Sequence, residues 1–288
     1  MFKLLISLLV LISLQPESVL ADPKETRSVM VGHLYPIMDD AEIVTRLFQK
    51  IVNLKPDYVF VLGDSRLYDS NVVKTWRRYF GAKVYFVPGN HEVRNGNLQQ
   101  FLDTVGYTQL VVDDANVRFL IGNSNGSARS LVDFIEKSSS KAAYKPTLLL
   151  VHHRIWDDTL TSASPYQHDK SFYLKDIFHS LEKHVNTIFA GNSKHQYFFD
   201  TPSPTGKQNM NNIFWADRIG NINAYSIGTG KGKPKLGFVE VISNSQYPAL
   251  VIPHHITTGL QDPIPVHKQI LDPKSVPPLK YKLMHTFP

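Results

Sequence analysis

Polar residues that could carry out chemistry follow apolar, strand-like stretches at several points of the sequence. The clearest case is VYFVPGNHE, residues 84–92, in which an apolar run ends in an amide, an imidazole and a carboxylate: Asn90, His91 and Glu92. A turn needs only Pro-Gly or Gly-Asn. The additional His-Glu therefore indicates a chemical role for this loop, with Glu92 expected to hold the loop or to orient His91.

Four other strand-like stretches end in the same way, at Gly32-His33, Gly63-Asp64, His152-His153 and Gly191-Asn192-Ser193-Lys194-His195. In α/β proteins, reactive groups collect on the loops beyond the carboxyl ends of the strands. We therefore expect these loops to meet at one edge. Asp, Asn and His suit divalent transition metals such as Mn, Fe or Zn. One or two such ions could activate water and clamp a phosphoester.

Strand and helix patterns alternate along most of the chain. Helical spacing is found at 43–52, 72–80, 98–105, 131–135 and 172–183, and strand-like runs at 28–31, 58–62, 84–87, 118–121, 147–151 and 187–190. Short strands follow at 213–215, 225–227 and 236–242. This order predicts a single α/β domain with sheets packed between helices. Asp39-Asp40 is expected to cap the first helix, although either carboxylate could instead reach a metal site.

The strand-end motifs resemble those of the calcineurin-like metallophosphoesterase family. The resemblance runs from about Val29 to Ile242 and rests on GDS at 63–65, PGNHE at 88–92, VHHR at 151–154 and AGNSKHQYF at 190–198. It implies a layered α/β/β/α sandwich and hydrolysis of a phosphoester by metal-activated water. By the same resemblance Asp64 would bridge the metals, Asn90 and His152 would bind one, His33 would bind the other, and His91 would be the catalytic acid or transition-state stabiliser.

Two of the family's motifs are altered in this chain. Val31 replaces the aspartate of the first Asp-x-His motif, and the last motif, Gly-His-x-His in the family, reads Gly-Asn-Ser-Lys here. Asn192 could coordinate through its amide, and a bulge could bring in His195, which follows one position late. Lys194 could replace the charge of an ion. The sequence therefore predicts a one-metal or remodelled site.

The two ends of the chain differ from its centre. Lys3 precedes an apolar run over 4–14, and Ala21 is a suitable cleavage residue, which predicts a signal peptide over residues 1–21; a retained anchor is the alternative. Because the chain has no cysteine, a secreted or periplasmic location is expected. The predicted domain covers residues 22–245, and the proline-rich segment 246–288 is predicted to be an extended tail, a candidate for binding a protein partner.

The overall charge favours an anionic substrate. The formal net charge is +6, but no Lys/Arg run exists. A phosphorylated small molecule or glycan is therefore expected, and nucleic acid is not. No stable membrane span is expected after signal cleavage.

Two other functions remain open on the sequence. The altered motifs also fit a catalytically inactive protein on the metallophosphoesterase scaffold, acting as a binding component of the cell envelope. The GDS motif also resembles the nucleophile block of GDS-type serine esterases, with Ser65 as nucleophile and Asp176 and His179 as its partners.

Overall fold

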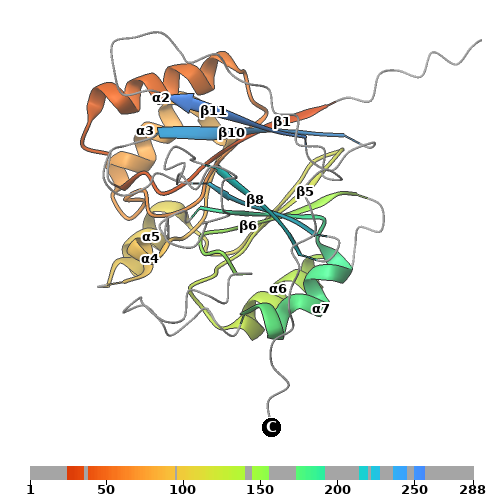
Figure 1. The fold of residues 1–288 in the computed structure, drawn as a ribbon. Coiled ribbons are helices and arrows are strands. Elements are labelled where there is room, and N and C mark those ends of the chain that lie inside the picture. Colours follow the sequence, from red (N-terminus) through yellow and green to blue (C-terminus); the bar gives the residue numbers. More distant parts are fainter. Residues whose placement is uncertain are drawn as a thin grey trace, which may run out of the picture.

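Two β-sheets face each other in the centre of the molecule, and helices cover their outer faces (Figure 1). The computed structural model describes residues 25–35, 38–94, 96–139, 145–155, 173–191, 214–219, 222–227, 236–244 and 250–256. The helices are α2 (Ala41–Asn53), α3 (Ser70–Phe80), the 3-10 helix η2 (Gly81–Lys83), α4 (Asn90–Val93), α5 (Asn97–Val105), α6 (Ala128–Ser139) and α7 (Tyr173–His184).

The first sheet has the strand order β11-β10-β1-β2-β3, and the second has the order β4-β5-β6-β7-β9-β8. The strands of the first sheet are β1 (Thr26–Val31), β2 (Tyr58–Val61), β3 (Val84–Phe86), β10 (Leu236–Ser243) and β11 (Leu250–Ile256). Those of the second are β4 (Leu110–Asp113), β5 (Arg118–Ile121), β6 (Thr147–Val151), β7 (Thr187–Ala190), β8 (Phe214–Ile219) and β9 (Ile222–Ile227). β1, β2 and β3 are parallel to one another, as are β5, β6, β7 and β9. In each sheet, the carboxyl ends of these strands therefore lie at the same edge.

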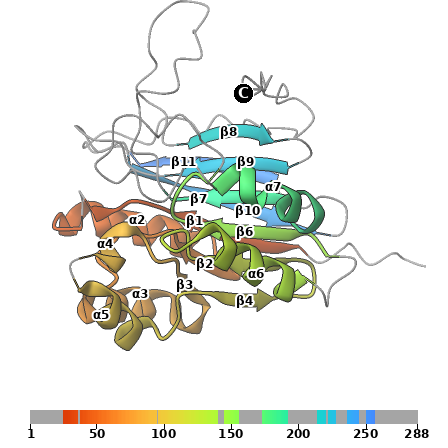
Figure 2. The same ribbon diagram turned by 90° about the horizontal axis from the view of Figure 1, so that it is seen from below.

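Three apolar clusters hold the layers together. Phe48 of α2 and Trp76 of α3, with ring centroids 4.4 Å apart, pack on one face of the first sheet. Between the sheets, Phe60 and Phe119 lie 4.6 Å apart. Ile177 of α7 packs on the outer face of the second sheet, where α6 and α7 lie over its strands (Figure 2). The expected α/β/β/α sandwich is therefore confirmed.

The central strands are apolar on both faces. Val29 and Val31 of β1 belong to the cluster beneath the helices, whereas Met30, between them, belongs to the cluster between the sheets. Successive residues of a strand point to opposite faces, and a sheet covered on both sides needs apolar residues at every position. This requirement explains the continuous apolar runs that predicted these strands.

The first sheet continues beyond residue 245, where the sequence predicted an extended tail. β11 pairs antiparallel with β10, and Ile242 lies opposite Leu250. Pro253 lies within β11, and proline is tolerated there because β11 is an edge strand with only one ladder to maintain. Residues 1–21, which were predicted to be a signal peptide, lie outside the described residues, as do residues 246–249 and 257–288 of the predicted tail.

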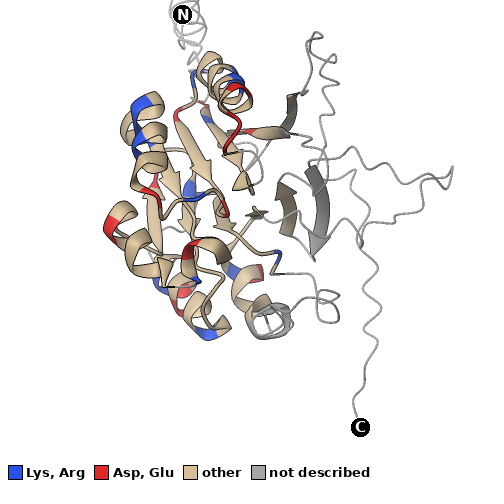
Figure 3. Cartoon of the chain, turned by 90° about the vertical axis from the view of Figure 1, so that its left-hand side faces the viewer, with Lys and Arg blue, Asp and Glu red and all other residues tan. Residues whose placement is uncertain are grey.

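Charged side chains of both signs lie on the outer helices (Figure 3). Four exposed basic residues occur on α3 and η2: Lys74, Arg77, Arg78 and Lys83. Part of the net positive charge thus belongs to the outer helical layer. Within the described part of the chain, no helix combines the length and the apolar character needed to cross a bilayer.

Candidate metal centre at the strand ends

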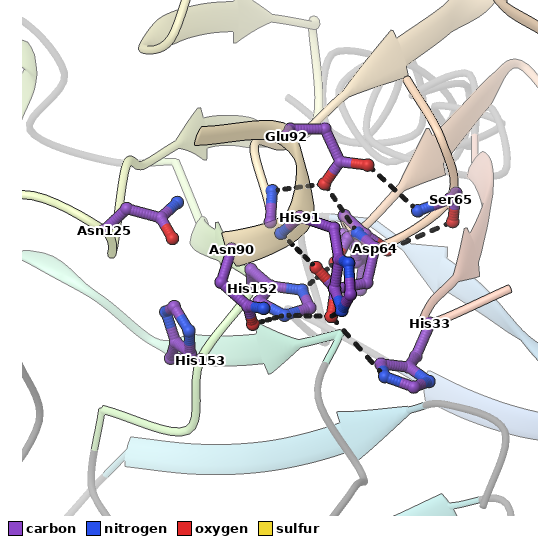
Figure 4. Close-up of polar contacts among 12 residues, drawn as sticks. His33, Asp64, Ser65, Asn90, His91, Glu92, Asn125, His152 and His153 are labelled. Atoms are coloured by element: carbon purple, nitrogen blue, oxygen red, sulfur yellow. Dashed lines mark hydrogen bonds and ion pairs between the residues drawn. The ribbon is translucent and has the colours of Figure 1, made fainter. Parts of the chain in front are cut away.

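Five of the predicted site residues meet at the carboxyl ends of four strands (Figure 4). They follow β1, β2, β3 and β6, which come from both sheets, and are His33, Asp64, Asn90, His91 and His152. Four of them are nearly inaccessible, with exposed fractions of 6% or less, whereas the His91 side chain is 36% exposed. The site is thus a buried polar group with His91 on its open side.

Asp64 is the centre of this group. Its Oδ2 atom lies 3.3 Å from His152 Nε2, 3.5 Å from His33 Nε2 and 4.0 Å from His91 Nε2. Charge-assisted hydrogen bonds are shorter, about 2.7–2.9 Å. Asp64 Oδ1 accepts the backbone N–H of His91 at 2.9 Å. One oxygen of this carboxylate therefore holds the neighbouring loop, and the other faces three imidazoles.

The hydrogen bond of His152 defines which of its nitrogens faces Asp64. Nδ1 lies 2.8 Å from the carbonyl oxygen of Leu62, which can only accept, so Nδ1 carries a proton. In the neutral ring, Nε2 then presents a lone pair to Asp64 and to Asn90 Oδ1, which is 3.3 Å away. Two oxygen acceptors facing a lone pair require a positive charge between them. Either a proton on Nε2 or a metal cation would provide that charge.

The pKa values of the buried groups follow from the same contacts. Burial alone would raise the pKa of Asp64, but the His152 and His33 imidazoles and the backbone N–H of His91 outweigh burial and hold this pKa well below its usual range. Burial alone would lower the pKa of His152, but the negative charge of Asp64 and the hydrogen bond to Leu62 raise it. The site therefore keeps an ionised carboxylate in its interior, which favours a bound cation.

The described donor atoms fit a single ion position better than a complete two-metal site. Two donor atoms about 2.1 Å from the same ion are separated by roughly 3.0–3.4 Å, and the Asp64–His152 and Asn90–His152 distances of 3.3 Å match this separation. His33 approaches Asp64 from a different side (Figure 4). Among the described residues, no three His, Cys, Asp or Glu side chains are grouped to hold an ion. The donors that match the expected separation therefore include an amide, that of Asn90, beside Asp64 and His152.

Two glycines allow neighbouring backbone segments to approach each other closely here, one between the two sheets and one within the first sheet. A Cβ atom on Gly191, at the end of β7, would lie 1.8 Å from the Leu62 carbonyl oxygen. A Cβ atom on Gly89 would lie 2.3 Å from the backbone nitrogen of Asp64. Neither position can accept a side chain without moving backbone. The glycines of these two motifs therefore set the distance between the loops that carry the polar residues.

Glu92 joins two of these loops. Its fully buried carboxylate accepts four backbone N–H groups: Asp64 at 2.8 Å, Gly89 at 2.9 Å, and Ser65 and Leu67 at 3.1 Å each. Burial, together with the charge of Asp64, raises the pKa of Glu92. Of the two roles expected for Glu92, the structure shows that of holding the loops.

Replacing Glu92 with glutamine should therefore destabilise the fold. One carboxylate oxygen becomes an NH2 group that faces two backbone donors, and a loss of about 3 kcal/mol in the free energy of unfolding is expected. Urea denaturation measures it. Glu240→Gln is the matched control, because Glu240 is also buried but contacts the side chains of Arg27 and His254. A loss no larger than in the control would contradict the assigned role.

The altered first motif has a clear structural basis. Val31 is fully buried in the apolar cluster beneath α2 and α3. Neither nearby aspartate replaces the missing carboxylate, since the Asp40 side chain accepts from the backbone nitrogen of Ile43 and caps α2, and Asp39 forms an ion pair with Arg66. The expected helix cap is confirmed, and His33 faces Asp64 without a second carboxylate from its own motif.

Three predicted site residues, Asn192, Lys194 and His195, lie outside the described residues. Gly191, which precedes them, lies against Leu62 at the site. The serine-esterase alternative lacks support in the described geometry: the buried Ser65 hydroxyl donates to the Gly63 carbonyl at 3.0 Å and accepts the backbone N–H of Leu34 at 3.3 Å. Its expected partners belong to α7, which packs on the outer face of the second sheet.

A residue that the sequence did not single out is Tyr35. Its ring stacks on that of His91, with centroids 4.6 Å apart and an interplanar angle of 24°. No spacing rule links residues 35 and 91, so only the folded structure could reveal this contact.

The fold and the strand-end site together define a metallophosphoesterase-type sandwich. A model of the calcineurin-like phosphoesterase family matches residues 37–219, which is more than half of the chain. The chain belongs to the calcineurin-like phosphoesterase family. The match begins after His33, so it excludes the altered first motif and includes those around Asp64, Asn90 and His152. Membership supports phosphoester hydrolysis as the general class of reaction.

Solved structures of similar fold share little sequence with this chain. A dimetal phosphatase from Danio rerio is 13% identical, covers 80% of this chain and 99% of its own, and has a TM-score of 0.47. Vacuolar protein sorting 29 from Cryptosporidium parvum is 10% identical, with coverages of 82% and 93% and a TM-score of 0.44. The NAD nucleotidase of Haemophilus influenzae is 12% identical, with coverages of 81% and 56% and a TM-score of 0.46. No curated protein matches the chain by sequence.

Proposed function

We propose that this protein is an exported, metal-dependent phosphoester hydrolase whose site holds a single divalent transition metal, Mn, Fe or Zn. The observation that carries the proposal is that Asp64 Oδ2 and Asn90 Oδ1 each lie 3.3 Å from His152 Nε2. The Leu62 carbonyl supports it, since ligating histidines commonly donate their other N–H to such a group.

Each residue has a separate task in the proposed reaction. A bound ion would polarise the phosphoryl group and lower the pKa of a water molecule. Asp64, Asn90 and His152 would hold that ion, and Glu92 holds the loop that carries Asn90 and His91. As water attacks the phosphorus atom, the bond to the leaving oxygen breaks, and protonated His91 donates its proton to that oxygen and becomes neutral.

His33 is proposed as a ligand of a weaker, second position beside Asp64. Within the described residues this position has only one imidazole and the shared carboxylate, because Val31 is directed into the apolar core. Asn192, Lys194 and His195 are the candidates to complete or replace it. A second ion therefore depends on the segment that follows β7.

The substrate is proposed to be a phosphorylated small molecule or glycan outside the cytoplasm. The net charge of +6, the signal-like N-terminus and the absence of cysteine support this assignment. The segment after β11 is proposed to contact a protein partner of the envelope.

Both altered motifs favour the inactive-scaffold function: the last motif reads Gly-Asn-Ser-Lys, and Val31 stands at a ligand position. An apolar residue there removes a negative charge that would attract a metal. The two functions predict different metal contents for the protein, because a scaffold does not need a bound metal.

The proposal predicts about one transition-metal ion per chain. The measurement is elemental analysis of the purified mature protein, residues 22–288, after incubation with manganese or zinc and gel filtration. The same protein denatured in urea is the control for weak binding by its 12 histidines.

Two ions per chain would mean that the segment after β7 completes the second position. No ion above the denatured control would reject the proposal in favour of the scaffold. Hydrolysis of phosphomonoesters and phosphodiesters is assayed on the same preparations, so that metal content and rate can be compared directly.

A further inference from the structure

The loop after β1 is held along the loop after β2 by consecutive backbone groups. His33 N donates to the Gly63 carbonyl at 3.2 Å, Leu34 N to the Ser65 hydroxyl at 3.3 Å, and Tyr35 N to the Asp64 carbonyl at 2.7 Å. Three successive N–H groups thus bind three successive residues. The backbone of Tyr35 is therefore placed at a defined position relative to Asp64.

The side chain of Tyr35 lies over His91 at the open side of the site. Its ring is stacked at 4.6 Å and 24° on the His91 ring, yet Tyr35 remains 41% exposed, one of the few large hydrophobic side chains of the described residues with such exposure. Its position combines exposure with contact to the proposed proton donor.

The plane of the His91 ring matters for its proposed role as proton donor. Its backbone N–H is bound by Asp64 Oδ1 at 2.9 Å, but its Nε2 atom lies 4.0 Å from Asp64 Oδ2, beyond a hydrogen bond. Because the backbone contact does not reach the ring, the plane of the imidazole depends on the contacts of the side chain, and Tyr35 provides one of them. A stacked aromatic ring restrains the plane of the imidazole.

We propose that Tyr35 is a positioning residue for His91: it holds the imidazole in the plane from which the proton reaches the leaving oxygen. This role rests on the proposed function of His91 as proton donor. It assigns a task to a residue outside the family's motifs, and it predicts that Tyr35 matters most for substrates whose leaving group needs a proton.

The test compares phenyl and 4-nitrophenyl phosphate esters, as monoesters and as diesters, with manganese present. Phenolate leaves poorly without a proton, whereas 4-nitrophenolate leaves without help. Tyr35→Ala should lower kcat for the phenyl ester about 10-fold and change the 4-nitrophenyl rate less than about twofold. Tyr35→Phe should restore both rates, because the ring and not the hydroxyl makes the stack.

The control is Tyr79→Ala, since Tyr79 is equally exposed at 41% but lies on α3 beside Phe48; both rates should be unchanged. In the double variant Tyr35→Ala/His91→Ala, the phenyl rate should equal that of His91→Ala alone. An equal loss on both esters in Tyr35→Ala, or a further loss in the double variant, would overturn the inference.

Ring order separates this inference from the proposed function. Carbon-13 relaxation of the His91 Cε1–H group should show a lower order parameter in Tyr35→Ala than in the unmodified protein, Tyr35→Phe or Tyr79→Ala. An unchanged order parameter in Tyr35→Ala rejects the inference whether or not the protein hydrolyses any ester. If the unmodified protein hydrolyses none of the esters, the proposed function is rejected. The order parameter then still decides whether Tyr35 holds His91.

Discussion

Replacing Asp64 with asparagine is expected to remove the bound metal and to lower phosphoester turnover by at least about 10³-fold. Asp64 Oδ2 faces His152, His33 and His91, so its charge is shared by every part of the proposed site. Asparagine keeps an oxygen for the backbone N–H of His91 and changes the volume little. The expected loss therefore reports the missing charge and not a collapsed loop.

Metal content and kcat are measured together on the purified variant, and urea denaturation confirms that it folds. Asp57→Asn is the matched control, because Asp57 lies just before the other end of β2 and accepts a single backbone N–H, from Arg27 at 2.9 Å. Its metal content and rate should be unchanged. Full metal and full rate in Asp64→Asn would refute the central role of this carboxylate.

The convergence of the site was predictable because strand direction determines it. Apolar runs at 58–62, 147–151 and 187–190 identified β2, β6 and β7, and in parallel sheets the residues after such runs lie at a common edge. The sequence therefore placed Asp64 and His152 among the strand-end loops that were expected to meet, but it did not show that β2 and β6 belong to different sheets. The separations of 3.3–4.0 Å around Asp64 required the two sheets to be packed together.

Features that depend on tertiary contacts could not be predicted in the same way. Glu92 was assigned to holding the loop or orienting His91, but its four N–H partners come from two loops separated by more than 20 residues. β11 was missed because Pro248 and Pro253 suggest an irregular tail, and pairing with β10 overrides that preference. β4 was missed because its apolar run, residues 110–112, is only three residues long and is followed directly by two aspartates.

Replacing His91 with alanine is expected to lower kcat by about 10²–10⁴-fold on a phenyl ester while leaving the metal content unchanged. The reason is its place in the site. The other four site residues are 6% exposed or less, whereas the His91 side chain is 36% exposed. Of the three imidazole nitrogens that face Asp64 Oδ2, His91 Nε2 is also the most distant, at 4.0 Å. It therefore faces the substrate side more than the ion side. An ester with a 4-nitrophenyl leaving group should lose much less activity.

The control for this variant is His179→Ala. His179 is an exposed residue of α7 and is the histidine that a serine esterase would require. If phosphoester hydrolysis depends on His91, the His179 variant keeps its full rate on both esters. If metal content falls in His91→Ala as far as the rate does, His91 is a ligand and not the acid, and proton donation to the leaving oxygen has to come from another group at the open side of the site. If the two esters lose activity equally, His91 acts by stabilising charge on the phosphoryl group, because that contribution does not depend on the basicity of the leaving oxygen.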